Sequence, residues 1–449
     1  MVREHRADGT EPTDRWWGSY AARASGMIAS EVRALFAVAS RPEIVSLAGG
    51  MPAVDALPLD AVASTVADLV TSRGRVALQY GSAQGDPELR ARICDVMAME
   101  GITDAHPDNV VVTVGSQQAL DLLTRVFVDP GDVVLTEGPT YVTAINTFAA
   151  YQARVVHVSM DGDGLVPDAL RETLTRLAAE GARVKLLYTV PTFQNPAGIT
   201  LTASRRAEVL EICRRAGVLV VEDNPYGLLS FTGEPVRAMR ADDPDGVVYL
   251  GSFSKTLAPG MRVGWALAPA PVAARLVLAA ESAILSHSMF TQLAVERYLA
   301  TQPWPEQIKA FREMYRDRRD AMLTALAETM PAGATWTRPE GGFFIWLTLP
   351  DGVDAKAMLP RAIAARVAYV PGTGFYADGS GRNAMRLSYC YPPPERIRDG
   401  VRRLADVLRA EISLRQTFAP LATTDPRATD PRATDPRPVA PRTSDFRDQ

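Results

Sequence analysis

The middle of this chain alternates short apolar runs rich in β-branched residues with longer amphipathic stretches, and this alternation limits its fold more than any other feature. The run at 109–115 (NVVVTVG) is typical of a buried strand, and at 116–128 apolar residues follow at helical spacing. The same two patterns alternate along 153–160, 166–181, 184–191 and 204–217, and further apolar runs lie at 218–227, 246–255 and 262–269. Apolar strands separated by helices indicate a sheet covered on both faces, so we predict an α/β fold.

A second, smaller α+β unit is expected toward the C-terminus. A helical pattern runs from Pro305 to Thr329, and strand-like runs and a closing helical pattern follow at 341–350, 365–372, 385–392 and 393–412. The repeat that begins at Thr424 (TDPRATDPRATDPRP) has almost no large apolar residue, and such a segment cannot offset the entropy lost on ordering. We therefore predict an N-terminal arm at 1–45 with a short helix at 28–39, a large domain at 46–304, a small C-terminal domain at 305–415 and a disordered tail at 416–449.

Composition and charge exclude several classes of function. The net charge of −4 argues against nucleic acid as a partner, because phosphate neutralisation needs a basic surface. Three cysteines lie far apart and form no metal-binding pair, so we expect a reducing compartment and no metal. The charged N-terminus does not resemble a secretory signal, and no apolar run reaches the roughly 18–20 residues of a membrane span. We predict a cytoplasmic protein without a membrane partner.

One lysine has neighbours that point to covalent chemistry. The chain has only four lysines, namely Lys185, Lys255, Lys309 and Lys356. Lys255 lies in YLGSFSKTLAPGMRVGW, where it follows a strand-like run, stands beside Ser252 and Ser254, and precedes Arg262 by seven residues. An amine at a strand end is free to form an imine, and the hydroxyls and the arginine can hold a phosphate. Lys255 is thus a candidate Schiff-base lysine for pyridoxal phosphate, and a solvated lysine in a serine-rich turn is the alternative.

Two other strand ends carry groups that suit the same cofactor. Pyridoxal phosphate acts as an electron sink when its ring nitrogen stays protonated, which requires a buried carboxylate. Asp223 ends the apolar run in VLVVEDNPYG, and Tyr226 follows three residues later. Asn195 in PTFQNPAG follows another strand-like run, and its amide can donate to the phenolic oxygen of the ring. An ion-paired aspartate and a simple Asn-Pro turn remain the alternatives at these positions.

The segment VGSQQAL supplies a possible anion site. It places Gly115, Ser116 and Gln117 at the start of a predicted helix, where free backbone N–H groups bind anions. A plain helix cap at Ser116 is the alternative. Each of these segments alone fits its structural alternative, but together they fit one cofactor.

The motifs GSQQALDL, PTFQNPAG, EDNPYG, SFSKTLAPGMR and MRLSYC, in this order, resemble those of the fold-type I pyridoxal-phosphate aminotransferases of class I/II. The resemblance is strongest to the group that contains 2-aminoadipate and kynurenine aminotransferases. SLAGGMP, LQYGSAQGDPELR and RPEGGFFIW fit the same group, and the resemblance extends from about Ser25 to Ile412. It implies a large cofactor-binding domain with a mostly parallel central sheet and a smaller α+β domain.

The resemblance also implies roles for individual residues around the cofactor. Lys255 would carry the cofactor and act with Asp223 and Tyr226 in catalysis. Asp223 would pair with the ring nitrogen, while Asn195 and Tyr226 would bond the ring oxygen. The remaining cofactor contacts would come from Tyr141, stacked on the ring, and from Ser116, Gln117, Ser252, Ser254 and Arg262, around the phosphate.

Further implied roles concern the substrate and the partner subunit. Arg386 would bind the substrate α-carboxylate, and Gly50 and Asn195 would lie against the substrate. Tyr80 would reach the phosphate of the neighbouring subunit, so the resemblance implies a homodimer with shared active sites. One departure is visible, because many relatives have two aspartates before the Pro-Tyr pair and Asn224 takes the second place here.

The hypothesis that follows is a PLP-dependent aminotransferase that moves an amino group between an L-amino acid and a 2-oxo acid, with glutamate and 2-oxoglutarate as one pair. A lyase, decarboxylase or oxidase on the same fold is the first alternative. The effector domain of a transcription regulator is the second alternative. It fits less well because the roughly 45 residues that precede SLAGG are not strongly basic.

The side-chain preference of the substrate stays open. Arg33 would favour a distal carboxylate, as in glutamate or 2-aminoadipate, whereas Trp16, Trp17, Tyr20 and Phe344 would favour an apolar side chain.

Overall fold

A central sheet of eight strands forms the larger part of the molecule. The computed structural model describes residues 14–27 and 41–418. In spatial order the strands are β2 (Val110–Thr113), β9 (Gly264–Leu267), β8 (Val247–Ser252), β7 (Leu219–Asp223), β6 (Val184–Thr189), β3 (Val133–Gly138), β4 (Arg154–Asp161) and β5 (Gly164–Leu165). The five strands from β8 to β4 are parallel, and the pairs at both edges are antiparallel. The predicted α/β class with a mostly parallel sheet is confirmed.

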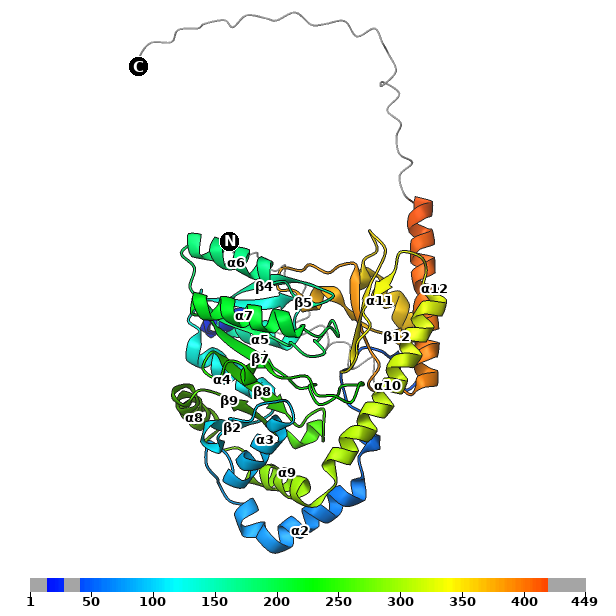
Figure 1. Cartoon of the computed structure of the whole chain (residues 1–449). Helices are drawn as coiled ribbons and strands as arrows, with labels where there is room; N and C mark the ends of the chain where they lie inside the picture. The colour runs from blue at the N-terminus through cyan, green and yellow to red at the C-terminus, as the bar shows by residue number, and fades with distance from the viewer. Residues whose placement is uncertain (1–13, 28–40, 419–449) are drawn as a thin grey trace, which may run out of the picture.

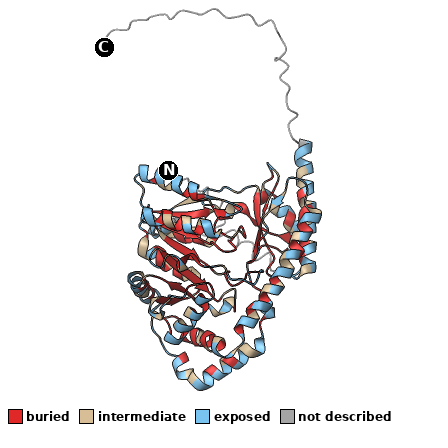
Figure 2. Cartoon of the chain, viewed as in Figure 1, coloured by how far each residue is buried: buried red, intermediate tan, exposed pale blue. Residues whose placement is uncertain are grey.

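Helices cover both faces of this sheet because alternate strand residues point to opposite sides. Val134 of β3 belongs to the apolar cluster that contains residues of α4 (Ser116–Phe127) and α8 (Ala270–Ile284), whereas its neighbour Leu135 belongs to the cluster with α6 (Pro167–Ala179) and α7 (Ala203–Ala216). Figure 2 shows the buried strands between helices whose outer faces are exposed. α5 (Val142–Ala150) packs against α4.

A second, smaller sheet lies beside the first. Its antiparallel strands are β10 (Thr335–Trp336), β11 (Phe344–Thr348), β14 (Ala384–Ser388) and β13 (Val370–Pro371). The long helices α10 (Trp304–Thr329) and α12 (Pro394–Phe418) lie side by side against this region, together with α11 (Ala355–Ala364) (Figure 1). α12 continues through Phe418, so the helix extends three residues into the range that the sequence assigns to the tail.

A short parallel pair connects the start of the described main segment to this smaller unit. β1 (Val45–Ser46) pairs with β12 (Val367–Ala368), and the N–H of Ser388 in β14 donates to the carbonyl of Leu47. These contacts hold residues 47–50 between the two sheets, which brings Gly50 to the pocket. The domain boundaries given above stay a prediction.

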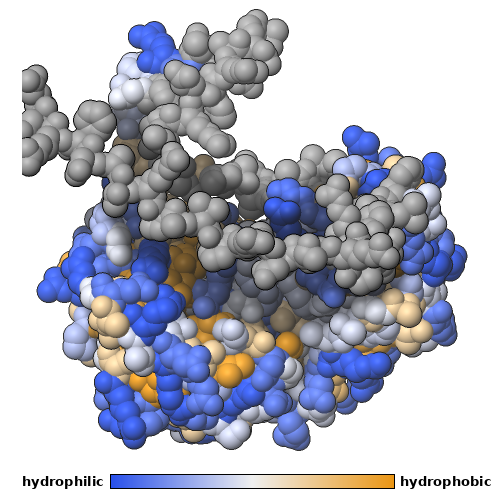
Figure 3. Space-filling view, turned by 90° about the horizontal axis from the view of Figure 1, so that it is seen from above, coloured by the Kyte–Doolittle hydropathy of each residue, from blue (hydrophilic) through white to orange (hydrophobic). Residues whose placement is uncertain are grey.

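Three further helices pack together beside the edge strand β2, namely α2 (Leu59–Ala77), α3 (Pro87–Ala98) and α9 (Met289–Thr301). Short 3-10 segments lie at Trp17–Ser19, Ala22–Gly26, Val54–Ala56, Pro107–Asn109, Met239–Ala241, Pro259–Met261 and Gly372–Phe375. Seen from above, the described surface is mostly hydrophilic, with hydrophobic patches between (Figure 3). None of the described helices combines the length and apolar character of a membrane span. The predicted helix at 28–39 lies outside the described residues, as do residues 419–449 of the predicted tail.

Candidate active site

One pocket collects nearly all of the predicted site residues. It has a volume of about 490 Å³ and lies at the carboxyl ends of β6, β7 and β8, where ligand sites of α/β sheets are found. The predicted residues in its lining are Gly50, Ser116, Gln117, Tyr141, Asn195, Asp223, Tyr226, Ser252, Ser254, Lys255, Arg262 and Arg386. Tyr80 does not line the pocket and is 77% exposed, and Arg33 lies outside the described residues.

Lys255 lies in the turn that follows β8. Its Nζ donates to the carbonyl oxygen of Gly50 at 2.9 Å and stands 5.7 Å from the centre of the Phe343 ring. Burial disfavours the ammonium form and lowers the pKa of Lys255 to about 8. An amine with this pKa is in part neutral near physiological pH, which suits it for nucleophilic attack and for proton transfer.

Asp223 offers the pocket an unpaired carboxylate oxygen. The hydroxyl of Tyr188 in β6 donates to Oδ2 at 2.8 Å, while Oδ1 is buried and has no hydrogen-bond partner among the described residues. Burial raises the pKa of Asp223 to about 6, and the bond from Tyr188 and the charge of Lys255 act in the opposite direction. A buried oxygen of this kind calls for a donor from a ligand, and the protonated nitrogen of a pyridine ring supplies one. The site therefore fits pyridoxal phosphate at this point.

The start of α4 forms an anion cradle with the segment after β8. Gly115 caps α4 with φ of 75°, and a Cβ atom there would stand 2.5 Å from Nη2 of Arg262, so the position suits only glycine. Arg262 is held by a bond from Nη2 to the carbonyl of Val114 at 2.8 Å, and the hydroxyls of Ser252 and Ser254 are 2.8 Å apart. Helix N–H groups, hydroxyls and a guanidinium around one hollow suit a phosphate.

Arg386 in β14 lines the same pocket from the small sheet. It is 3% exposed, and its guanidinium carbon lies 4.2 Å from the ring centre of Phe344 and 5.0 Å from that of Phe375. Nη1 donates to Oδ1 of Asn195 at 2.9 Å and Nη2 to the carbonyl of Ala48 at 2.7 Å. Nε is buried and has no hydrogen-bond partner in the described part of the chain. Burial lowers the pKa of Arg386 to about 10, so it stays charged at neutral pH and suits a carboxylate ligand.

Two tyrosines of the pocket, Tyr141 and Tyr226, have hydroxyls that stay uncharged. Burial raises the pKa of both Tyr141 and Tyr226 above the ordinary tyrosine value. Tyr226 packs edge-on against Phe343 and Phe344, with ring centres 5.3 and 6.0 Å apart. These contacts fix the tyrosine ring beside Asp223 and Lys255.

Two of the aromatic residues expected to favour an apolar substrate do not line the pocket. The lining also includes residues that the sequence did not single out. Trp16 and Tyr20 are 56% and 55% exposed and do not line the pocket, whereas Phe344 does. The added lining residues include Tyr188, Val190, Met51, Val142 and Thr143. One sequence signal could have indicated Tyr188 as a site residue: it lies near the carboxyl end of a strand that neighbours the strand of Asp223.

Sequence comparison identifies the family. The family model described as aminotransferase class I and II matches residues 42–404. The chain belongs to the class I and II aminotransferases. Among its relatives, an aromatic-amino-acid aminotransferase 1 of Thermococcus litoralis is 42% identical over 89% of this chain and 96% of that protein. A 2-aminoadipate transaminase of Thermus thermophilus is 38% identical over 89% of this chain and 98% of that protein.

Solved structures agree with this assignment. A kynurenine aminotransferase of Pyrococcus horikoshii, solved with PMP, covers 88% of this aminotransferase with a TM-score of 0.84 and 41% identity, over 97% of its own chain. An α-aminoadipate aminotransferase of Thermus thermophilus, complexed with N-(5'-phosphopyridoxyl)-L-leucine, covers 89% with a TM-score of 0.82 and 37% identity, over 99% of its own chain. The predicted family, fold-type I architecture, aminotransferase activity and pyridoxal phosphate cofactor are confirmed, and the substrates are small amino acids and 2-oxo acids.

Proposed function

We propose that this aminotransferase holds pyridoxal phosphate in the pocket around Lys255 and uses Lys255, Asp223 and Tyr226 in catalysis. The observation that carries the proposal is the unpartnered Oδ1 of Asp223 in the same pocket as an amine whose pKa is lowered to about 8. Bound there, the cofactor supplies an electron sink for negative charge on the α-carbon of the substrate.

Each residue has a distinct part in this proposal. Lys255 would carry the cofactor until the amino group of the donor displaces it, and the freed amine would then take the α-proton of the donor and return a proton later in the cycle. Asp223 keeps the ring nitrogen protonated, and Asn195 and Tyr226 bond the ring oxygen. The remaining roles are those of Tyr141 on the ring face, of Ser116, Gln117, Ser252, Ser254 and Arg262 around the phosphate, and of Arg386 and Gly50 at the substrate.

The central test of this proposal is the variant Lys255→Ala. Because no other lysine among the described residues lines the pocket, kcat is expected to fall by at least ~10²-fold, and the visible absorption band of the bound cofactor should be lost. The kcat is measured by amino transfer from a panel of L-amino acids to 2-oxoglutarate. The loss of the band is measured by the visible absorbance of the purified protein. Lys309→Ala, on the exposed side of α10, is the matched control and should behave as wild type. Full transaminase activity in Lys255→Ala would reject the assignment.

The preferred donor depends on two groups of residues. Met51, Val142 and Phe344 present apolar surface to the pocket, which suits aromatic and apolar side chains such as those named by the Thermococcus relative. Arg33 is the candidate partner of a distal carboxylate, as the 2-aminoadipate relative would require. We propose that both classes are substrates, with glutamate and 2-oxoglutarate as one pair.

Arg33→Ala separates these two modes of recognition. It should raise KM at least ~10-fold for dicarboxylic donors, because a charged hydrogen-bonded pair is lost, and leave KM for phenylalanine within about two-fold. Steady-state kinetics on the donor panel provides the measurement. An unchanged KM for glutamate and 2-aminoadipate would remove Arg33 from the substrate site.

A homodimer with shared sites completes the proposal. Tyr80 is 77% exposed, and two apolar side chains just before it in sequence are also exposed, Leu78 at 74% and Val76 at 50%. Exposed apolar side chains close together are typical of an interface between subunits. Tyr80 would then reach the phosphate in the pocket of the partner. The cytoplasmic location stays a prediction.

A further inference from the structure

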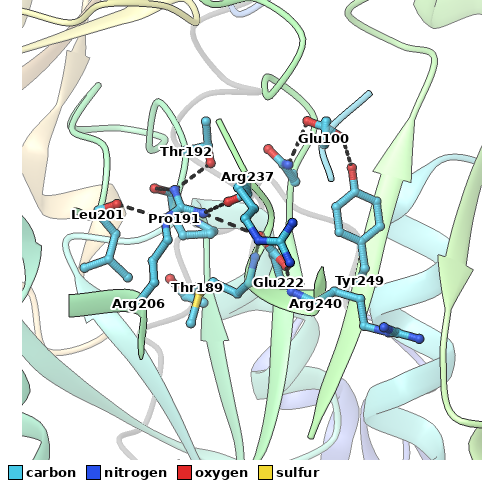
Figure 4. Close-up of polar contacts among 12 residues, drawn as sticks. Glu100, Thr189, Pro191, Thr192, Leu201, Arg206, Glu222, Arg237, Arg240 and Tyr249 are labelled. Carbon is cyan, nitrogen blue, oxygen red and sulfur yellow. Dashed lines mark hydrogen bonds and ion pairs between the residues drawn. The ribbon is translucent and has the colours of Figure 1, made fainter. Parts of the chain in front are cut away.

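A buried carboxyl lies directly behind the segment that carries Asp223 and Tyr226. Glu100, in the turn after α3, is 3% exposed. Its Oε2 accepts a bond from the hydroxyl of Tyr249 at 2.5 Å, and its Oε1 accepts one from Nδ2 of Asn224 at 3.0 Å. Figure 4 shows the Tyr249 hydroxyl pointing at this carboxyl. Both donors are uncharged, and burying a carboxyl with only such partners is costly.

Asn224 connects Glu100 to the end of β7. It follows Asp223 directly, and its backbone N–H donates to the carbonyl of Leu250 in β8 at 2.9 Å. The residue after Asp223 is therefore held through its backbone by β8 and through its side chain by Glu100. An aspartate at position 224 would set a second carboxylate against Glu100, whereas the amide of Asn224 supplies a donor.

The loop after Asn224 closes tightly on the same carboxyl. A Cβ atom at Gly227 would stand 1.7 Å from Oε1 of Glu100 and 2.7 Å from Nδ2 of Asn224. Tyr226 lies between these two residues and points into the pocket lining. Glu100 is thus in contact with both ends of the loop that places Tyr226.

We propose that Glu100 is a positioning residue, which acts through Asn224 and Gly227 to fix Asp223 and Tyr226 at the pocket. Glu100 itself is not part of the described pocket lining, so it acts without touching cofactor or substrate. The inference rests on the proposed function, because it takes Asp223 as the partner of the ring nitrogen.

The surroundings of Glu100 keep its carboxyl uncharged, so the positioning role does not require a negative charge. Burial raises its pKa to about 8, and nearby Glu222 of β7 adds to the shift. Tyr249, Asn224 and Arg206 of α7 act in the opposite direction. The uncharged carboxyl therefore predominates at neutral pH, and glutamine reproduces its shape and charge.

Three variants test the proposal through cofactor affinity and kinetics. Glu100→Leu and Asn224→Ala each remove the Glu100–Asn224 bond, so the Kd for pyridoxal phosphate should rise about ten-fold in each. In both variants kcat should fall while KM for the amino donor stays within about two-fold, because Asp223 acts on the cofactor. Glu100→Gln should remain within about two-fold of wild type in Kd and kcat. Combining Glu100→Leu with Asn224→Ala should add little, because both break one interaction.

Glu222→Gln provides a control for simple loss of stability. Glu222 is also buried, but it accepts bonds from the backbone N–H groups of Met239 and Arg240. Figure 4 shows Glu222 beside Arg240. This variant should lower Tm and leave the Kd for pyridoxal phosphate unchanged. The proposal is overturned if Asn224→Ala keeps the wild-type Kd and kcat, or if Glu222→Gln raises Kd as much at an equal loss of Tm. If Glu100→Leu does not fold, the Kd and kcat of Asn224→Ala are enough to test the proposal. Failure of the wild type to bind the cofactor would instead reject the proposed function.

Discussion

At the scale of single residues, burial sets the chemistry of the pocket. It raises the pKa of Asp223 to about 6, lowers that of Lys255 to about 8 and lowers that of Arg386 to about 10. In each case the charged form is disfavoured by removal from water. The ring nitrogen proposed for Asp223 and the substrate carboxylate proposed for Arg386 would restore the charged forms of these two groups, so binding and ionisation are linked.

The bond from Tyr188 to Asp223 gives a prediction about pH. A protonated carboxyl cannot pair with a protonated ring nitrogen, so affinity for the cofactor should be present above the pKa of Asp223, about 6, and be lost as pH falls through it. Tyr188→Phe removes a bond that lowers this pKa, and the midpoint should move to higher pH. Kd for pyridoxal phosphate measured from pH 5 to about 8 tests this.

Tyr298→Phe is the matched control for that measurement. The hydroxyl of Tyr298 donates to Oε1 of Gln307 at 2.5 Å, outside the pocket. The pH midpoint of cofactor affinity in Tyr298→Phe should equal that of wild type. A wild-type midpoint in Tyr188→Phe as well would show that the Tyr188 bond does not set the charge of Asp223.

At the scale of elements, the edge of the large sheet supports the phosphate cradle. Gly264 begins β9 between β8 and β2. A Cβ atom there would stand 2.6 Å from both the backbone N of Ser116 and the backbone carbon of Gly115. Because these are main-chain atoms, they cannot rotate away as a side chain could. The absence of a side chain at Gly264 is what lets the start of α4 lie on the sheet.

Gly264→Ala should therefore displace the cradle. We expect a loss of about 1–3 kcal/mol in the free energy of unfolding and a weaker affinity for pyridoxal phosphate. Thermal unfolding of the apoprotein and cofactor titration measure the two effects. Gly162→Ala, where the added Cβ meets no atom within 4 Å, should change neither. Wild-type cofactor affinity in Gly264→Ala would contradict the role given to β9.

At the scale of the whole molecule, the pocket draws on parts of the chain far apart in sequence. Lys255 follows the large sheet, Arg386 lies in the small sheet, and Gly50 is held between them by the pairing of β1 with β12. Relative movement of the two sheets would thus change the distance between the groups for cofactor and substrate. In the proposed dimer, the exposed Leu78 and Val76 beside Tyr80 would bring a second chain to this arrangement.

Leu78→Glu tests the proposed dimer. A charge at this 74% exposed leucine should disfavour association, so sedimentation should show a monomer where the wild type is a dimer. Affinity for pyridoxal phosphate should fall as well, because the partner's Tyr80 is lost. Leu414→Glu, at a 45% exposed leucine of α12, should stay dimeric. A dimeric Leu78→Glu variant with unchanged affinity would rule out this interface.

The sequence alone determined the elements whose pattern is local. The β-branched runs became β2, β4, β6, β7, β8 and β9, and the helical stretches became α4, α6, α7, α10 and α12. β3 and α5, which flank Tyr141, were not singled out. Lys255 and Asp223 could be named because short motifs at strand ends carry them, whereas Arg386, in the middle of β14, was named only through the family resemblance.

Only the tertiary structure decided which groups share a bond. Tyr188 and Asp223 are 35 residues apart in sequence, and Glu100 and Asn224 are 124 apart. No local pattern records such a pair, because a hydrogen bond depends on how strands and turns are placed in space. The same holds for the pKa values, which follow from burial by the whole fold. The sequence thus determined the chemical groups and their strands, and the folded chain determined their partners and their charge.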